Sequence, residues 1–466
     1  MGKHYPRILI FGVHFSEGSG PGTFLGRLFS AWPTDCIATV DISTGFPDWR
    51  RCQRHYRAGE LRFPLRALSR WLVPDGRLGP MSPAAAGALT TTAKQAPISL
   101  SRRVARYPWR AFLRLVGEWD AIFSNTPSPQ LLAWVRDFQP EVIYGHCAGL
   151  NRVLFLRHIQ QALGLPLVLH IMDDFPEVLY RNGLFSPFMR PRYLAEFSEL
   201  VGSANVAIAI CKEMAEEYER RYRRRVTSLS MPVELDAYQT VFRTQWTAGR
   251  PFRLQFGGRV GWALRESLVD IAHAVSLLQK EGAAIVFDIL TFEPEQVPAI
   301  CHNSSGVTVQ RAVPTGELPR RQAEADVLVI CLDFDGKSVR QAKYSMPSKT
   351  AGCMASGTPI LVYGPAGSPV VEYARREGWG RVVDRRDPVK LRTAVRELME
   401  SAALRERLGS TARRLAIERH DAKAVSENLR VWLQNLAVGN RCDRRSRALP
   451  DASVAEAKTE SRKSHS

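Results

Sequence analysis

Short apolar runs alternate with segments of helical periodicity along most of this chain of 466 residues. An apolar run bounded by turn residues is typical of a buried strand, and a helix between two such strands lets them pair in parallel. A first series of predicted strands covers residues 7–12, 37–41, 121–124, 141–146, 165–171 and 205–210. The alternation therefore predicts a parallel sheet with helices on its faces.

The alternation restarts after an irregular segment at 232–251, with predicted strands at 252–256, 284–290, 307–311, 326–331, 359–362 and 381–383. The length agrees with two domains, because one domain spans about 150 residues. We therefore expect an α/β protein with two Rossmann-like, doubly wound domains, at residues 1–236 and 250–420. Apolar residues at helical spacing predict a last helix at 421–438, and the polar segment 439–466 is expected to be a disordered tail.

The chain carries 64 Lys and Arg against 46 Asp and Glu, a formal net charge of +18 that favours an anionic partner. Many of these cations fall between Arg50 and Arg110, interleaved with aromatic and aliphatic residues. The pattern predicts a basic helical insertion at about 50–115, which either lies on an anionic membrane surface or forms a solvated basic surface. No nucleic acid is expected as a partner, because no nucleic-acid-binding motif accompanies the charge.

The first apolar stretch is too short for a signal peptide, and no apolar run approaches the ~20 residues that span a bilayer. We therefore expect a cytoplasmic protein that is at most peripheral on the inner face of the cell membrane. Eight cysteines are scattered without a C-x-x-C pair or a nearby His at metal-ligand spacing. They are expected to be reduced, mostly buried and free of zinc.

A glycine-containing loop follows the opening strand and includes Ser19, Gly20, Gly22 and Thr23. Glycine lets the backbone approach a ligand closely, and the free N–H groups of the helix that follows can face a phosphate. The loop is predicted to lie near the reaction centre, although a tight turn without a ligand would explain it as well.

A second loop, at the end of the first strand of the second series, contains Gly258, Arg259 and Arg265. Arginine can bind phosphate oxygens through two hydrogen bonds, and glycine allows close backbone contact. The pattern predicts a diphosphate site, with a surface arginine as the alternative for Arg265.

Titratable residues end a predicted buried strand of the first domain, at His170, Asp173 and Asp174. The carboxyl edge of a parallel sheet is where open α/β folds bind ligands. His170 and Asp173 are therefore predicted to be catalytic, with Asp173 orienting His170, whereas Asp174 is equally consistent with a helix cap. His146, at the end of the preceding strand, is a weaker candidate.

The segment 344–372 carries the most specific pattern. Pro347, Ser348 and Lys349 would open a helix whose first N–H groups and lysine face an anion. Gly357 would end that helix before a buried strand, and a glycine-containing loop then leads to Glu372.

With these elements the chain resembles the GT-B glycosyltransferases, in particular a family-four subgroup with a Pro-Ser-Lys helix start. The resemblance rests on the Gly258–Arg259 turn, on the segment 354–372 and on the His170 element. It implies that helix 421–438 crosses back onto the first domain, and that this domain binds the acceptor. It also implies that the second domain binds a nucleotide diphosphate sugar through Gly258, Arg259, Arg265, Pro347, Ser348, Lys349 and Glu372.

The resemblance further implies a retaining reaction that needs no metal or other cofactor. Asp333-Phe334-Asp335 is spelled like a metal-binding D-x-D motif but lies in the wrong half of the chain. A pair of glutamates that the family uses for the donor sugar and the ribose is replaced here by Tyr344 and Gly352. The donor pocket must therefore recognise the sugar and the ribose in another way.

We therefore expect a glycosyltransferase of the hexosyltransferase type, which moves a sugar from a nucleotide diphosphate sugar to a lipid-linked saccharide in surface polysaccharide synthesis. Two alternatives stay open. A non-catalytic scaffold of the same fold would bind a nucleotide sugar without transferring it, and a nucleotide-sugar epimerase would need no acceptor.

Overall fold

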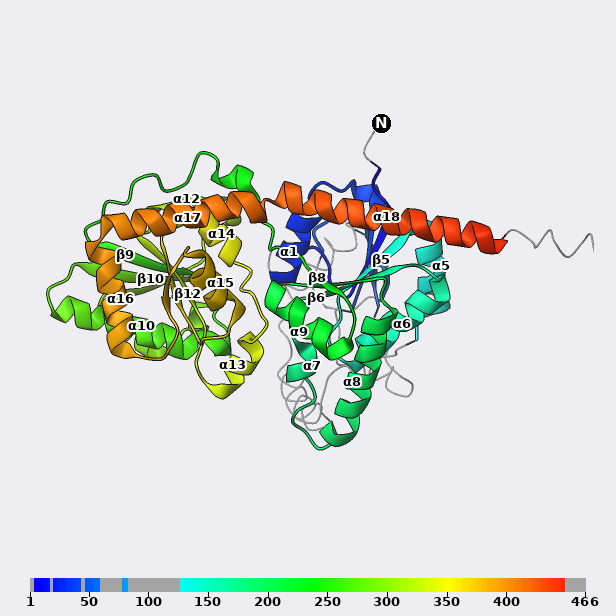
Figure 1. The fold of residues 1–466 in the computed structure, drawn as a ribbon, viewed down its shortest axis with the longest axis horizontal. Coiled ribbons are helices and arrows are strands. Elements are labelled where there is room, and N and C mark those ends of the chain that lie inside the picture. Colours follow the sequence, from blue (N-terminus) through cyan, green and yellow to red (C-terminus); the bar gives the residue numbers. More distant parts are fainter. Residues whose placement is uncertain (1–3, 17–19, 43–46, 59–77, 83–125, 449–466) are drawn as a thin grey trace, which may run out of the picture.

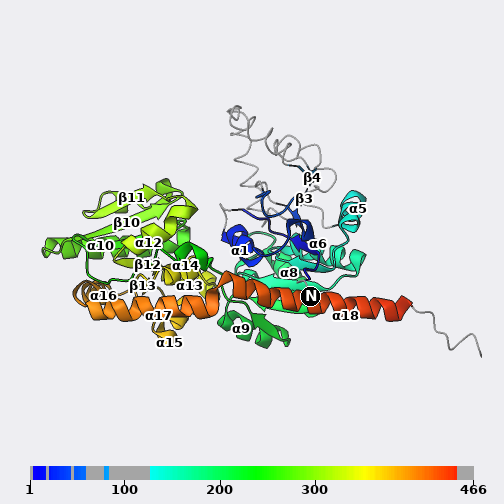
Figure 2. The same ribbon diagram turned by 90° about the horizontal axis from the view of Figure 1, so that it is seen from above.

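A computed structural model of the chain describes residues 4–16, 20–42, 47–58, 78–82 and 126–448. The strands form two separate sheets, each covered by helices, and the two domains built on them lie side by side (Figure 1, Figure 2). The predicted α/β class with two doubly wound domains is confirmed.

The sheet of the first domain has eight strands in the order β4-β3-β2-β1-β5-β6-β7-β8. The chain order reverses at β1, which pairs in parallel with both β2 and β5, so this is a switch point at which open α/β sheets bind ligands. The strands are β1 (Ile8–Phe11), β2 (Ile37–Asp41), β3 (Arg54–Arg57), β4 (Gly79–Met81), β5 (Val142–Gly145), β6 (Leu167–Ile171), β7 (Val206–Ala209) and β8 (Val226–Ser228).

β3 and β4 correct the prediction of a helical insertion at about 50–115. β3 pairs in parallel with β2, since the edge of β2 would otherwise expose unpaired backbone groups. Arg57, counted among the cations of the insertion, belongs to this strand and is only 5% exposed. The rest of the predicted insertion and the predicted strand at 121–124 lie outside the described residues.

The helices of the first domain connect these strands and bury their apolar sides against the sheet. Residues of β1 and β5 such as Leu9 and Ile143 are fully buried, as expected for parallel strands that are covered on both faces. The helices are α1 (Gly20–Leu28), α5 (Pro129–Phe138), α6 (Leu150–Leu163), α7 (Phe175–Val178), α8 (Ser186–Ser203) and α9 (Lys212–Tyr222).

The sheet of the second domain has six parallel strands in the order β11-β10-β9-β12-β13-β14. They are β9 (Phe252–Gly257), β10 (Ile285–Thr291), β11 (Val307–Arg311), β12 (Val327–Cys331), β13 (Ile360–Tyr363) and β14 (Arg381–Val383). The main helices are α10 (Arg265–Lys280), α12 (Leu318–Glu324), α13 (Gly336–Ala342), α14 (Thr350–Ala355), α15 (Pro369–Glu377) and α16 (Pro388–Glu400). Each strand overlaps its predicted range.

The chain then returns to the first domain, as the resemblance implied. α17 (Ala402–His420) packs on the second domain, and α18 (Ala422–Ala448) contacts α1 and β5 of the first (Figure 1). The two passages between the domains are tied together, because the Val233 N–H donates to the His420 carbonyl (2.8 Å) and the Ala422 N–H donates to the Val233 carbonyl (2.9 Å).

α18 continues past residue 438, where the sequence predicted its end, and the predicted tail beyond residue 448 lies outside the described residues. Among the helices that the structure describes, none is both long and apolar enough to cross a bilayer.

Candidate active site

Three predicted elements meet at the junction of the two domains. The Ser345 hydroxyl donates to Asp173 Oδ1 (3.3 Å), which joins the segment before α14 to the end of β6. A Cβ placed on Gly20 would lie 3.8 Å from Ser348 Oγ, so the loop after β1 adjoins the Pro-Ser-Lys segment. The junction therefore collects predicted residues from both domains.

The glycine loop of the first domain differs in detail from its prediction. Gly20, Gly22 and Thr23 form the first turn of α1 instead of preceding it, and the Thr23 hydroxyl donates to the Ser16 carbonyl (3.4 Å). Ser19 lies outside the described residues.

Gly258 and Lys349 adjoin each other in the second domain. Gly258 has φ +136°, and a Cβ there would lie 3.7 Å from Lys349 Cδ. Arg259 and Arg265, in contrast, are exposed. The turn after β9 thus leaves room for the lysine and presents two arginines beside it.

Lys349 is part-exposed as a residue, but its ammonium is buried and lacks a hydrogen-bond acceptor among the described residues. Its Nζ lies 3.6 Å from the centroid of the Phe256 ring and has no hydrogen-bond partner among the described residues. Burial lowers the pKa of the ammonium. α14 begins at Thr350 and has six residues, so the lysine side chain, more than the short helix, supplies the positive charge. Because buried polar groups are almost always paired, this ammonium is a candidate ligand-binding group.

Asp174 is buried and forms an ion pair with the part-buried Arg221. Arg221 of α9 donates to both oxygens of Asp174 (2.9 and 3.0 Å), and the Tyr218 hydroxyl donates to Oδ1 (2.9 Å). Asp174 is at the N-cap position of α7 but makes no side-chain cap hydrogen bond, so the cap role is not supported. The guanidinium of Arg221 also lies 5.4 Å from the ring centroid of Tyr344 in the second domain. The ion pair therefore holds Arg221 in contact with the ring of Tyr344 across the domain junction.

His170 does not pair with Asp173. It is 1% exposed, its Nδ1 shares a hydrogen bond with the Tyr144 hydroxyl, and its ring packs against Phe24 of α1 (centroids 5.3 Å apart). Burial and the neighbouring His146 lower its pKa to about 3. The predicted orientation of His170 by Asp173 is corrected for a simple reason: His170 points from the strand into a helix-covered face, whereas Asp173 lies beyond the strand end.

A polar cluster at the carboxyl edge of the first sheet contains the predicted candidate His146, together with His14 and Asp41, which the sequence did not predict. His14 Nδ1 and Asp41 Oδ2 are 2.5 Å apart, and the Nδ1 of His146 donates to the His170 carbonyl (3.1 Å). Burial lowers the pKa of His146 to about 4, so its imidazole is neutral at pH 7. Asp41 ends an apolar run just as the carboxylates after β6 do, and that signal could have identified it.

Tyr344 and Gly352, which replace the two glutamates of the family, are both packed against other residues. A Cβ on Gly352 would lie 3.1 Å from the Tyr238 hydroxyl, which itself donates to Gln322 Oε1 (2.8 Å). A glutamate at 352 would therefore need Tyr238 to move. Tyr344, as described above, stacks on Arg221.

The carboxylates of Glu372, Asp333 and Asp335 form hydrogen bonds with backbone N–H groups. Glu372 Oε1 accepts from the Gly367 N–H (2.9 Å) and pairs with Arg375, so it holds its own loop. Asp333 accepts from the Ser267 N–H (2.7 Å), and Asp335 caps α13.

Two cavities lie between the domains, and a third lies within the first domain. One interdomain cavity, of about 190 Å³, is lined by Cys211 of the first domain and by Met346 and Tyr373 of the second. The other, of about 130 Å³, is lined by Gly22 and Thr23 of the first domain, Tyr238 of the linker and Leu318 of the second.

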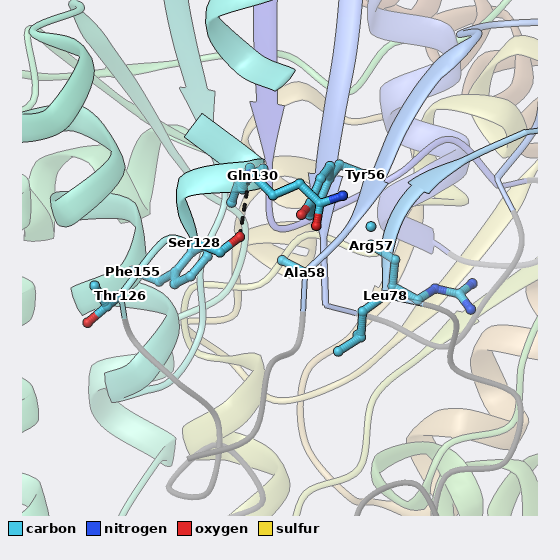
Figure 3. A pocket seen from close by; sticks show the side chains of 10 residues that line it. Tyr56, Arg57, Ala58, Leu78, Thr126, Ser128, Gln130 and Phe155 are labelled. Carbon is cyan, nitrogen blue, oxygen red and sulfur yellow. Dashed lines mark hydrogen bonds between the residues drawn. The ribbon is translucent and has the colours of Figure 1, made fainter. Parts of the chain in front are cut away.

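The third cavity, of about 40 Å³, lies within the first domain beside β3, β4 and α5, where Tyr56, Gln130 and other side chains line it (Figure 3). It is much smaller than the two cavities between the domains, so those two are the better candidates for a substrate.

The chain matches no protein-family model and no curated protein sequence. It is similar in structure to HepE of Anabaena in complex with UDP and glucose, with TM-score 0.58, 12% identity and coverage of 92% of this chain and 100% of that one. It is also similar to sucrose-phosphate synthase from Thermosynechococcus elongatus (TM-score 0.58, 12% identity, 93% and 99% covered).

A third similar structure is the α,α-trehalose 6-phosphate synthase from Burkholderia multivorans (TM-score 0.53, 10% identity, 94% and 100% covered). The match extends over nearly the whole length of each chain, and from it we conclude that this chain has the GT-B fold.

Proposed function

We propose that the chain is a family-four-like glycosyltransferase that transfers a hexose from a nucleotide diphosphate sugar to an acceptor. One observation carries this proposal: the buried Lys349 ammonium has no acceptor among the described residues and lies beside the glycine turn at the domain junction. A diphosphate supplies the acceptor oxygens that such an ammonium needs.

A positive charge at this place suits the chemistry of sugar transfer. When the bond between the sugar and the diphosphate breaks, negative charge develops on the departing phosphate. Lys349 would stabilise that charge from a site shielded from water, and the exposed Arg259 and Arg265 would close on the outer oxygens. The UDP and glucose bound to HepE, a protein of the same fold, support a nucleotide sugar as the donor.

The acceptor side would be the carboxyl edge of the first sheet. His14, Asp41 and His146 present hydrogen-bonding groups there, suited to sugar hydroxyls. The proposed acceptor is a lipid-linked saccharide in surface polysaccharide synthesis, the reaction is proposed to retain configuration, and the enzyme would work at the cytoplasmic face of the membrane as a peripheral protein.

Transfer is proposed to need no metal and no other cofactor. The two carboxylates of the D-x-D sequence support this view, because Asp333 and Asp335 are bonded to backbone N–H groups near their own helices.

The test is incubation of the full chain with labelled uridine, guanosine and thymidine diphosphate sugars, with and without a membrane lipid extract. We expect one donor to release its nucleoside diphosphate and to label the lipid fraction, in the presence of a chelator as in its absence. Binding without release under every condition would support the scaffold instead. An altered sugar nucleotide formed without extract would identify an epimerase.

A further inference from the structure

A projecting tip of the first domain exposes apolar side chains that the proposed transfer does not use. The tip comprises residues 181–192, from the end of α7 into α8, on the side of the first domain away from α18 (Figure 1). Leu184, Phe185 and Phe188 are 69%, 44% and 78% exposed. Large apolar residues that are exposed next to one another mark an interaction surface.

The base of the tip is firmly anchored. Tyr180 and Tyr193, which flank it, are 4% and 0% exposed, and their ring centroids lie 5.1 Å apart. The Leu150 N–H donates to the Tyr180 hydroxyl (2.8 Å). The apolar residues are therefore held outward by a buried anchor.

The charge of the tip indicates what it meets. Residues 181–192 include three arginines and no acidic residue. Arg181 pairs with Glu177, Arg190 Nη1 donates to the Leu179 carbonyl (2.9 Å), and Arg192 is exposed. An apolar centre with cations beside it complements a bilayer whose headgroups are anionic and whose interior is apolar.

A second copy of this chain is a poorer partner for the same surface. In a two-fold contact each patch meets itself, so the arginines of one tip would be brought toward those of the other, with no acidic residue of the tip to pair with them. We propose that the tip docks the protein on an anionic membrane, with Leu184, Phe185 and Phe188 entering the headgroup region. This surface is separate from the segment at 50–115, and the docking does not depend on the proposed transfer.

Co-sedimentation of the full chain with phospholipid vesicles tests the proposal. We expect binding to vesicles of phosphatidylcholine mixed with phosphatidylglycerol, and about tenfold weaker binding for Phe188→Glu, which puts a charge where an apolar ring should enter. The matched control is Phe292→Glu, because Phe292 is also exposed (52%) but follows β10 in the second domain. Arg192→Glu should weaken binding by about fivefold, and Arg385→Glu, at another exposed arginine, should not.

Three outcomes would overturn the proposal. The first is an absence of binding by the wild type, and the second is equal binding by wild type and Phe188→Glu. The third is a dimer in sedimentation velocity that Phe188→Glu dissociates while vesicle binding is unchanged, because the tip would then bind a second copy. Both phenylalanines are exposed, so equal melting temperatures of the variants should show that folding is not the cause.

Discussion

Arg221 and Lys349 both bring a positive charge to the junction between the domains, but their surroundings differ. Arg221 has bonds to Asp174 and Glu217 and an aromatic contact with Tyr344. Lys349 has an aromatic contact with Phe256 and no hydrogen-bond acceptor among the described residues. The fold therefore satisfies the first cation and leaves the second for a ligand, which separates a structural group from a binding group of the same charge.

The largest effect should come from breaking the satisfied pair. Arg221→Ala should cost about 3–5 kcal/mol of unfolding free energy, because it leaves the buried Asp174 carboxylate without its counter-charge. Urea denaturation at pH 7 measures this. Arg220→Ala is the matched control, since the Arg220 side chain is 73% exposed and pairs with the same Glu217; it should stay within about 0.5 kcal/mol of wild type. Equal stabilities of the two variants would contradict the structural role of Arg221.

The contrast between these two cations shows where sequence reasoning succeeds. Apolar runs and their bounding residues predicted every strand of the second sheet, and β1, β2, β5, β6 and β7 of the first, because parallel strands buried on both faces leave a continuous local signal. The short strands β3, β4 and β8 were not predicted. The Pro-Ser-Lys segment and the glycine turn were predicted as neighbours of one ligand, and Gly258 does adjoin Lys349.

Sequence reasoning fails where a contact joins distant elements. No local pattern pairs Asp174 with Arg221, or Asp173 with Ser345, because these pairs form only when the helices and domains pack. Likewise, Arg259 and Lys349 both lie beside the same glycine turn, and only packing decides that Arg259 is exposed while the Lys349 ammonium is buried.

Lys349→Met should weaken ligand binding without destabilising the fold, whereas Arg221→Ala should destabilise the fold. The affinity for a nucleoside diphosphate should fall by about tenfold to a hundredfold, because a charge-assisted hydrogen bond contributes about 1.5–3 kcal/mol. The unfolding free energy should rise by about 1 kcal/mol, since a buried ammonium without an acceptor is removed. Calorimetric titration with UDP and other nucleoside diphosphates measures the first effect, and denaturation the second.

Lys343→Met is the control for that experiment, because Lys343 is exposed in the same segment. It should leave both quantities near the wild-type values. In the wild type, affinity should also fall as pH rises through the lowered pKa of Lys349, because only the protonated ammonium holds the phosphate. A loss of stability in Lys349→Met, with unchanged affinity, would make Lys349 a structural residue like Arg221.

The third expected effect concerns Asp173, which lies next to the satisfied pair but has no cationic partner among the residues that the structure describes. Burial raises its pKa from 3.8 to about 6, against the hydrogen bond from Ser345. A carboxyl whose folded pKa is raised stabilises the fold below its unfolded pKa, and this contribution is lost as pH rises through about 6. Asp173→Asn keeps the neutral form and the acceptor oxygen. It should match wild type near pH 3, where both states are protonated, and exceed it by about 2–3 kcal/mol near pH 8.

Denaturation at both pH values measures this difference, and Asp137→Asn is the control because the Asp137 side chain is 70% exposed. Asp173 and Asp174 are adjacent in sequence, but only Asp174 is paired with an arginine. The comparison of these two carboxyl groups therefore isolates the effect of the counter-charge. If Asp173→Asn were less stable than wild type at pH 8, the Asp173 carboxylate would have to be stabilised by a cation, and the junction would contain a second satisfied pair. If the stability gain were the same at both pH values, it would come from packing, since a titration effect must vanish where both states are protonated.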